Sequence, residues 1–325
     1  MPDSQPLISI VIRTYNRADR IGRAVRSALA QDWAHREIIV IDDGSKDNTR
    51  EVLLAFPEIR YHYQENAGLQ GARLAGLAQT AGEFVAYLDS DDEWHPDFLS
   101  RSMELFTRFP DSGLVFSNFE KVMFDRVSNE NTFQLFPQLR PLLAQDPLGA
   151  HYLDPAALRA LFIYHIPAPT SALVMRRALM PSTWSGVSKM SCDWMTALHM
   201  ILHQRIAGAF WACPRWTKWC DRDAIADGAH DSLYQARVRT HDRQIMLDNF
   251  RPLLTPAEQA VMTGDVADLN FSAGYELANQ RKIGLALKCL GTAFRYRPTA
   301  STALAIAKTC MKAVLPGKSR AVAAP

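Results

Sequence analysis

Hydrophobic residues form short runs and helical stripes that alternate along the first third of the chain. Runs rich in β-branched and aromatic residues occupy positions 8–12, 38–41 and 84–88, as is typical of strands buried in a parallel sheet. Between the first two runs, apolar residues recur at helical spacing over positions 21–29. This alternation predicts an α/β fold, a mainly parallel sheet flanked by helices on both faces.

The same patterns extend over the rest of the chain. We expect further strands at 59–63, 114–119, 170–175 and 206–211, and helices at 68–81, about 96–109 and 191–204. The periodicity weakens over 121–165, where several prolines predict a loop-rich segment. From 229 onwards the pattern is helical throughout. We therefore expect an α/β domain over 1–228 and a helical C-terminal region over 229–325.

Polar segments follow four of the expected elements of the sheet. They occupy positions 14–17, 42–47, 66–68 and 89–92. Ligands of open α/β sheets bind beyond the carboxyl ends of the strands. All four segments fall at that edge, which predicts a binding site there.

The acidic segment after the strand at 84–88 has the chemistry of a cation site. Asp89, Asp91 and Asp92 place three carboxylates within four residues, and unneutralised they would raise one another's pKa values. Mg²⁺ or Mn²⁺ binds one or two carboxylates together with phosphate oxygens. An isolated acidic cluster is more often a solvated turn, but its position after a buried strand favours a metal site.

Two other loops have the chemistry of a nucleotide site. Asp42 and Asp43 end a strand, and such carboxylates accept hydrogen bonds from a base or ribose. Asn66, Gly68 and Arg73 open a helix, where an N-terminus and a guanidinium favour a diphosphate. Alternatively, the first loop is a capped turn and Arg73 a surface residue.

Composition narrows the class of protein. The formal net charge is +2, which gives no general reason to expect a nucleic-acid partner. The five cysteines form no Cys-x-x-Cys pair, which is typical of free thiols in a reducing compartment. The first residues do not read as a signal peptide, and no apolar run approaches the roughly 20 residues of a membrane span. We therefore expect a cytoplasmic protein.

Four segments taken together resemble family 2 glycosyltransferases, which have the GT-A fold. In order, they are Ser9-Ile-Val-Ile-Arg-Thr-Tyr-Asn-Arg17, Val40-Ile-Asp-Asp-Gly-Ser-Lys-Asp-Asn-Thr49, Asn66-Ala-Gly68 with Ala72-Arg73, and Gly82-Glu-Phe-Val-Ala-Tyr-Leu-Asp-Ser-Asp-Asp92. The resemblance is close over about 7–110 and looser to about 220. It implies an inverting transferase that moves a sugar from a nucleoside diphosphate sugar to a hydroxyl acceptor.

The resemblance also implies roles for the matched residues. The donor half would span about 1–120 and the acceptor half about 121–228. Asp91 would be the principal ligand of Mn²⁺ or Mg²⁺, with Asp89 and Asp92 beside it. The residues implied to bind the nucleotide sugar are Thr14, Tyr15, Asn16, Asp42, Asp43, Asn66, Arg73, Asp89 and Ser90.

Asp193 is the candidate base that takes the proton of the acceptor. It matches the Asp of the Glu-Asp pair that the family carries at a helix start, but Cys192 replaces the Glu. A carboxylate can deprotonate an attacking hydroxyl if burial raises its pKa towards the working pH. Alternatively, Asp193 is a helix N-terminal acid favoured by the helix dipole.

Other candidates carry less weight. His199 and His203 have the i, i+4 spacing of a zinc site but lack an evident third ligand. Trp184 and Trp194 could stack on a sugar, although large aromatic residues are more often core. Arg222 and His230 match, at irregular spacing, positions at which the family contacts phosphate.

Missing motifs argue against some alternative functions, and one altered motif keeps another alternative open. Neither Gly-x-Gly-x-x-Gly nor a P-loop is present, which argues against a dehydrogenase and an NTPase. The altered pair at 192–193 keeps open a catalytically degenerate scaffold protein of a polysaccharide assembly. UDP is the expected nucleotide, with GDP and dTDP open, in the synthesis of a bacterial surface polysaccharide or glycoconjugate.

The sequence also leads to an expectation for the acceptor and for where in the cell the protein acts. The acceptor would be a glycan or a lipid-linked sugar, extended by one sugar per event. Six basic residues could hold the helical C-terminal region on the inner face of an anionic membrane, or they could form a solvated face: Arg281, Lys282, Lys308, Lys312, Lys318 and Arg320.

Overall fold

A computed structural model divides the chain into two compact units, residues 1–225 and 226–325. It describes residues 5–123, 126–128, 131–132, 136–143, 146, 149–163, 166–182, 186–220 and 232–314. Trp184, Arg222, His230, Lys318 and Arg320 lie outside these residues.

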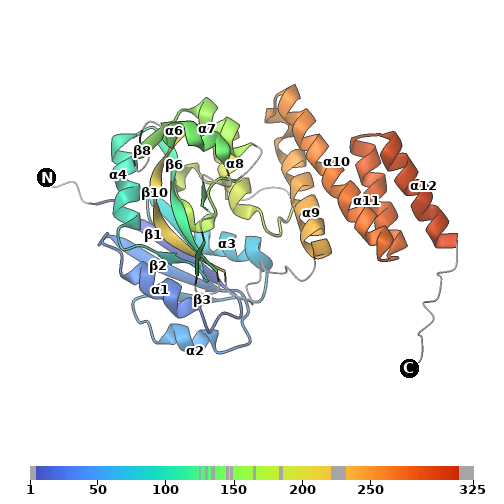
Figure 1. Ribbon diagram of the computed structural model, residues 1–325. Helices are drawn as coiled ribbons and strands as arrows, with labels where there is room; N and C mark the ends of the chain where they lie inside the picture. Colours follow the sequence, from blue (N-terminus) through green and yellow to red (C-terminus); the bar gives the residue numbers. More distant parts are fainter. Residues whose placement is uncertain are drawn as a thin grey trace. The chain divides into compact units, whose positions relative to one another are not determined.

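The first unit is built on one large sheet (Figure 1). Its strand order is β3-β2-β1-β4-β9-β6-β10-β5, with β7 paired to β6 and β8 to β10. Among the described residues its strands are β1 Ile8–Thr14, β2 Arg36–Asp42, β3 Arg60–Tyr63, β4 Phe84–Asp89, β5 Glu93–Trp94, β6 Ser112–Met123, β7 Arg126–Ser128, β8 Ala150–Leu153, β9 Leu173–Arg176 and β10 Ala207–Cys220.

The N-terminal half of the sheet is parallel, as the hydrophobic runs predict. β1 pairs in parallel with β2 and β4, and β2 with β3. All seven residues of β1 are buried, so both faces of this strand are covered. The second half is mixed, because β9 runs antiparallel to both β4 and β6.

Helices pack against the sheet and against one another. α3 packs on β1 and β2 and also contacts α8, and α8 contacts α7. α4 is tied to the segment that follows α1, because Leu99 N donates a hydrogen bond to Gln31 Oε1 at 3.0 Å. The helices of this unit are α1 Ile21–Leu29, α2 Thr49–Leu54, α3 Gly68–Gln79, α4 Phe98–Arg108, α6 Arg140–Leu143, α7 Pro155–Phe162 and α8 Cys192–Gln204.

Two segments of the second half differ from the expectation. The stretch expected to be loop-rich contains β8 and α7, and α7 begins where Asp154 accepts hydrogen bonds from Ala156 N and Ala157 N. The strand expected at 170–175 begins instead with a 3₁₀ turn, η2 Thr170–Ala172, before β9. Further 3₁₀ turns are η1 Pro137–Leu139 and η3 Arg177–Leu179.

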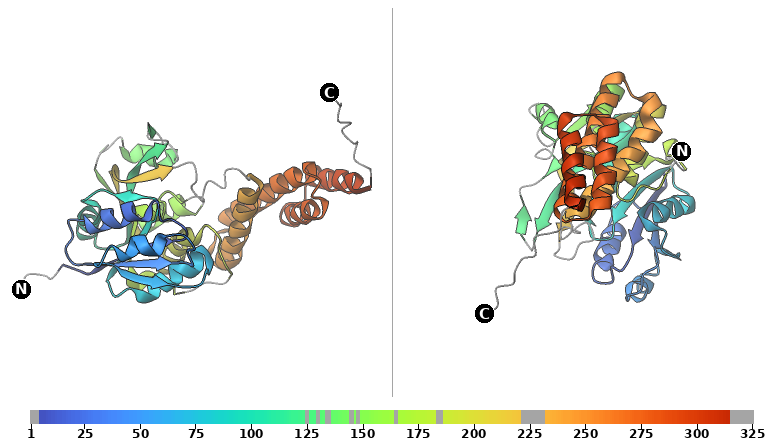
Figure 2. Two further views of the ribbon diagram at one scale, coloured as in Figure 1. Left: turned by 90° about the horizontal axis from the view of Figure 1, so that it is seen from below. Right: turned by 90° about the vertical axis from the view of Figure 1, so that its right-hand side faces the viewer.

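The second unit is helical, as expected from 229 onwards. Its elements are α9 Ser232–Phe250, η5 Arg251–Leu253, α10 Pro256–Asn279, α11 Ile283–Tyr296 and α12 Ala300–Val314. Successive helices pack side by side around residues such as Leu277 and Leu290 (Figure 2). No helix among the described residues is long and apolar enough to cross a bilayer.

Candidate active site at the carboxyl edge of the sheet

The loops after β1 and β2 are locked together by hydrogen bonds. Asn16 N donates to Ser45 Oγ at 2.9 Å, and Lys46 N donates to Asn16 Oδ1 at 2.8 Å. Asn16 adopts a positive φ of 51°, which an Asn tolerates better than most residues. Beside this junction, Thr14 is buried and Tyr15 half-buried. The polar segments at 14–17 and 42–47 therefore form one preorganised edge.

Asp42 and Asp43 have different structural partners. Asp42 accepts hydrogen bonds from Ser45 N and from the Tyr61 hydroxyl, each at 2.9 Å. Asp43 accepts from Ala67 N and Gly68 N, each at 2.9 Å, and thereby supplies an acid at the N-terminus of α3. Both carboxylates fix the loops of the predicted nucleotide site.

The helix start at α3 is held close to the β2 loop. Gly44 has a φ of +86°, and a Cβ there would lie 2.9 Å from Asn66 N. Asn66 itself is exposed, as a ligand-facing residue would be. Arg73, one turn further along α3, is fully buried, which contradicts the alternative of a surface arginine.

The three carboxylates after β4 have three different environments. Asp89 Oδ1 accepts from Arg13 Nη2 at 2.9 Å, and Asp92 Oδ2 accepts from Ser171 Oγ at 2.5 Å. Asp91 is half-buried, and within the described part of the chain no hydrogen bond or ion pair reaches its carboxylate. Ser90, between them, is buried.

Electrostatics at this segment follow burial and mutual repulsion. Burial, followed by the neighbouring Asp89 and Asp91 carboxylates, raises the pKa of Asp92 well above its ordinary value. Burial also raises the pKa of Asp89, although Arg13 opposes the shift. A nearby cation would relieve this repulsion.

The described residues contain no group of three or more His, Cys, Asp or Glu side chains placed to hold a metal ion. Asp89, Asp91 and Asp92 therefore do not converge into a three-carboxylate cage. Mg²⁺ and Mn²⁺ need only one or two carboxylates when phosphate oxygens and water complete the shell. Asp91, whose carboxylate is available, fits that kind of site.

Asp193 lies at the start of α8 and is held by two buried arginines. Arg73 Nε donates to its Oδ1 and Arg13 Nη2 to its Oδ2, each at 3.2 Å. Thr170 Oγ1 donates to Oδ2 at 2.5 Å. The exposed fraction of the Asp193 side chain is 6%.

These partners decide the protonation state of Asp193. Burial acts to raise its pKa, but Arg13 and Arg73 outweigh burial and hold the pKa below its ordinary value. Asp193 is therefore anionic at neutral pH, and the raised pKa that sequence reasoning required of a base is not found. In contrast, burial raises the pKa of Cys192 to about 12, so its thiol is neutral and does not replace a Glu in charge.

Three residues of this site were not found by sequence reasoning. Arg13 lies within a buried β-branched run, and a charge in such a run was the signal available. Thr170 and Ser171 lie in η2, which the pattern assigned to a strand. Each of the two hydroxyls donates to one carboxylate, Asp193 and Asp92 respectively.

The remaining candidates read as structural. Trp194 is buried and its Nε1 donates to Phe162 O at 2.7 Å. The rings of His199 and His203 stack with centroids 4.2 Å apart.

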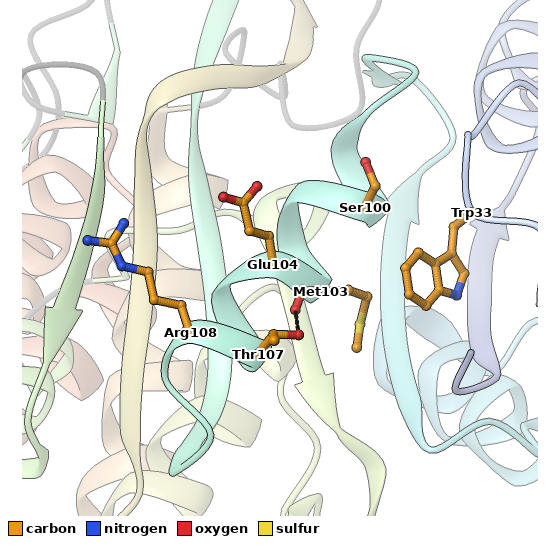
Figure 3. Close-up of a pocket in the computed structure, with 6 residues that line it drawn as sticks. All are labelled: Trp33, Ser100, Met103, Glu104, Thr107 and Arg108. Carbon is orange, nitrogen blue, oxygen red and sulfur yellow. Dashed lines mark hydrogen bonds between the residues drawn. The ribbon is translucent and has the colours of Figure 1, made fainter. Parts of the chain in front are cut away.

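A shallow pocket on the outer face of α4 is separate from this site (Figure 3). Its volume is about 420 Å³, and it contains none of the predicted site residues. The lining consists of Trp33, Ser100, Met103, Glu104, Thr107 and Arg108. Trp33 donates from its Nε1 to Pro6 O at 3.1 Å.

Comparison with known proteins points to one family. Residues 9–162 match the profile of glycosyl transferase family 2. The chain is 39% identical over 109 residues to the putative teichuronic acid biosynthesis glycosyltransferase TuaG of Bacillus subtilis, covering 32% of this chain and 43% of TuaG. It is 42% identical over 105 residues to the succinoglycan biosynthesis protein ExoO of Rhizobium meliloti, covering 31% and 30%. These matches span less than half of each relative.

Solved structures share the architecture at low identity. S. aureus TarS 1–349 in complex with UDP-GlcNAc superimposes with a TM-score of 0.63 at 18% identity, covering 94% of this chain and 88% of TarS 1–349. Mannosyltransferase PcManGT from Pyrobaculum calidifontis, in complex with GDP-Man and Mn²⁺, gives 0.52 at 17% identity, covering 97% and 82%. The likeness confirms the GT-A fold expected from the four motifs.

Proposed function

We propose that the chain, whose residues 9–162 match the profile of glycosyl transferase family 2, moves one sugar from a nucleoside diphosphate sugar to a hydroxyl acceptor, with inversion at the anomeric carbon. The observation that carries this proposal is the meeting of three elements at one sheet edge. They are the capped start of α3, the acidic end of β4 and the carboxylate of Asp193 on α8.

The donor half, about residues 1–120, would hold the nucleotide. Asp42, Asp43 and Asn16 fix the loops around the base and ribose, with Thr14, Tyr15, Asn66 and Ser90 lining the same edge. UDP is our choice of nucleotide, because TarS 1–349, the neighbour with the higher TM-score, carries UDP-GlcNAc. Arg73 supplies positive charge beneath the diphosphate site.

A divalent cation, Mn²⁺ or Mg²⁺, would neutralise the diphosphate as the leaving group departs. Asp91 would hold it, because its carboxylate is the one without a protein partner in the described chain. Asp89 and Asp92 are already bound by Arg13 and Ser171 and would support the site from behind. PcManGT was solved with Mn²⁺.

The acceptor half, about residues 121–228, would supply the base. Asp193 would take the proton of the acceptor hydroxyl as its oxygen attacks the anomeric carbon. The bond from that carbon to the diphosphate oxygen breaks at the same time, and the nucleoside diphosphate leaves with the electron pair. Inversion follows from this single displacement.

Asp193→Asn tests the proposed base. The variant keeps the shape of the side chain but cannot accept the proton, so we expect UDP release from UDP-sugars to fall by about 100-fold or more. UDP affinity in the presence of Mn²⁺ should stay within about threefold of wild type, since Asp193 meets the proposed donor site only through Arg73 and Arg13 and an Asn there keeps a carbonyl oxygen that accepts from them. Retained UDP binding also shows that the variant is folded.

The opposite results are equally informative. Unchanged UDP release would remove Asp193 from the mechanism. A wild-type chain that binds UDP but turns over no donor would favour the alternative, a degenerate nucleotide-sugar-binding scaffold. The specific feature in favour of that alternative is Cys192, because it leaves Asp193 as the one carboxylate of the pair, and two arginines already hold that carboxylate.

We propose in addition that the second unit contacts an anionic membrane surface and that the acceptor is a glycan or lipid-linked sugar there. Residues 277–325 contain nine Lys or Arg and no Asp or Glu. On α12, Leu304, Lys308, Met311 and Lys312 are all exposed and follow helical spacing along one face. Interleaved apolar and basic side chains suit a lipid surface better than a soluble polyanion, which has no apolar layer to receive Leu and Met.

A further inference from the structure

Arg13 occupies a position in which one side chain can connect both halves of the proposed active site. It lies in β1, opposite Asp89 of β4 in the parallel register. Its side chain is 4% exposed. A charge this deep in a central strand is costly unless it is paired, so its partners explain why it is tolerated there.

The partners of Arg13 come from two different elements. Its Nη2 donates to Asp89 Oδ1 at 2.9 Å and to Asp193 Oδ2 at 3.2 Å. Its Nη1 donates to Cys192 Sγ at 3.3 Å. A single nitrogen therefore joins the acidic end of β4 to the first turn of α8.

Arg73 also holds Asp193. Its Nε donates to Asp193 Oδ1 at 3.2 Å. Both guanidinium groups lie against the buried ring of Tyr87, Arg73 at 4.9 Å and Arg13 at 5.6 Å from the ring centroid. The ring of Tyr87, a residue of β4, thus packs against the guanidinium group of Arg13.

The buried cluster is balanced in charge. Arg13 and Arg73 bring two positive charges, and Asp89 and Asp193 bring two negative charges. The hydrogen bonds that join these four side chains restrict how they can be arranged. Its arrangement sets the separation between a donor-side carboxylate and the acceptor-side carboxylate.

We propose that Arg13 is the positioning residue of the transfer reaction: it fixes Asp193 relative to the donor-side segment at Asp89, so that an acceptor oxygen held by Asp193 faces the anomeric carbon. This inference rests on the function proposed above. Arg13 touches neither reacting atom in this role. The planar guanidinium is essential to it, because a lysine ammonium is a point charge that cannot hold three partners in a fixed fork.

The test compares Arg13→Lys and Arg13→Gln with wild type, with Arg26→Gln as the exposed control. UDP affinity is measured calorimetrically with Mn²⁺. Turnover is measured as UDP released from UDP-glucose and UDP-N-acetylglucosamine, with water as acceptor. Misplacement by about 1 Å costs on the order of 100-fold in rate, so we expect kcat of both variants to fall by about that factor, with UDP affinity within about threefold.

Arg13→Lys separates positioning from mere charge balance. If Arg13 only neutralises the two carboxylates, the lysine variant will melt and turn over like wild type, and the proposal is overturned. Loss of UDP binding in step with turnover would make Arg13 a donor-binding residue instead, which also overturns it. If the wild-type chain binds no nucleotide, the proposed function itself is contradicted, and the role proposed for Arg13 falls with it.

A second measurement tests the positioning role of Arg13 without measuring turnover. Asp89 and Asp193 are linked through Arg13, so the melting-temperature effects of Asp89→Asn and Asp193→Asn should be non-additive in the wild-type background. In the Arg13→Gln background the two effects should become additive. Equal non-additivity with and without Arg13 would show that the two carboxylates are coupled by another route, and Arg13 would lose its proposed role.

Discussion

At the scale of single residues, the three carboxylates of the acidic segment after β4 differ in their hydrogen-bond partners. Asp89 and Asp92 are tied to Arg13 and Ser171, whereas the carboxylate of Asp91 has no hydrogen bond or ion pair within the described chain. In the proposed donor site the two held carboxylates would fix the shape of the segment, and the available carboxylate of Asp91 would bind the cation. The sequence predicts that a cation site lies here but does not show which carboxylate stays available.

At this scale, the sequence alone predicts a candidate site residue only where the signal lies in neighbouring positions of the chain. Asp91 and Asp193 were identifiable because each follows a recognisable strand end or helix start. Arg13 was not, since its importance comes from partners 76 and 180 positions away. The lowered pKa of Asp193 has the same origin: two arginines from β1 and α3 outweigh the burial that sequence reasoning considered.

At the scale of elements, the alternating pattern of the first third predicts the strands and helices well. β1, β2, β3 and β4 all appear where the hydrophobic runs lie. The prediction was wrong over 121–165, because β8 is too short for a periodic signal and α7 depends on a cap at Asp154. The turn η2 was assigned to a strand because its residues are small and β-compatible.

Close packing of α3 on the sheet gives a prediction for Gly76→Ala. A Cβ at Gly76 would lie 2.4 Å from Val11 Cγ1 and 3.3 Å from Ile41 Cγ1. Overpacking should exceed the helix-propensity gain, so urea denaturation should show a loss of about 1–2 kcal/mol in the free energy of unfolding. At Gly291 in α11 nothing lies within 4 Å, so Gly291→Ala should gain about 0.5–1 kcal/mol. Equal effects at the two sites would contradict the packing described for α3.

At the scale of the whole molecule, the chain combines an α/β unit with a helical unit of a different electrostatic character. The overall charge of +2 conceals this division, because the acid-free segment 277–325 is strongly basic. The net charge therefore gave no sign of the basic segment on which the membrane proposal rests. The two compact units are residues 1–225 and 226–325; the division expected from the sequence, 1–228 and 229–325, stays a prediction.

The membrane proposal predicts selective binding to anionic vesicles. The full chain should co-sediment with phosphatidylglycerol-containing vesicles at low salt and not with phosphatidylcholine alone. Lys308→Glu with Lys312→Glu should weaken binding by about tenfold or more, given roughly 1 kcal/mol per basic residue. Leu304→Ser with Met311→Ser should weaken it too. Lys46→Glu with Arg50→Glu, exposed in the first unit, is the matched control.

Three results would overturn the membrane proposal. They are failure to bind anionic vesicles at low salt, an equal effect of the control pair, and binding to dextran sulfate in place of vesicles.

The most direct test of the central claim is calorimetric titration of the chain with UDP, GDP and dTDP, with and without Mn²⁺. We predict that one nucleotide, UDP, binds in a Mn²⁺-dependent manner and that Asp91→Ala abolishes this dependence. The exposed Glu58→Ala should bind like wild type. Absence of binding by all three nucleotides under either condition would contradict a donor site at this sheet edge.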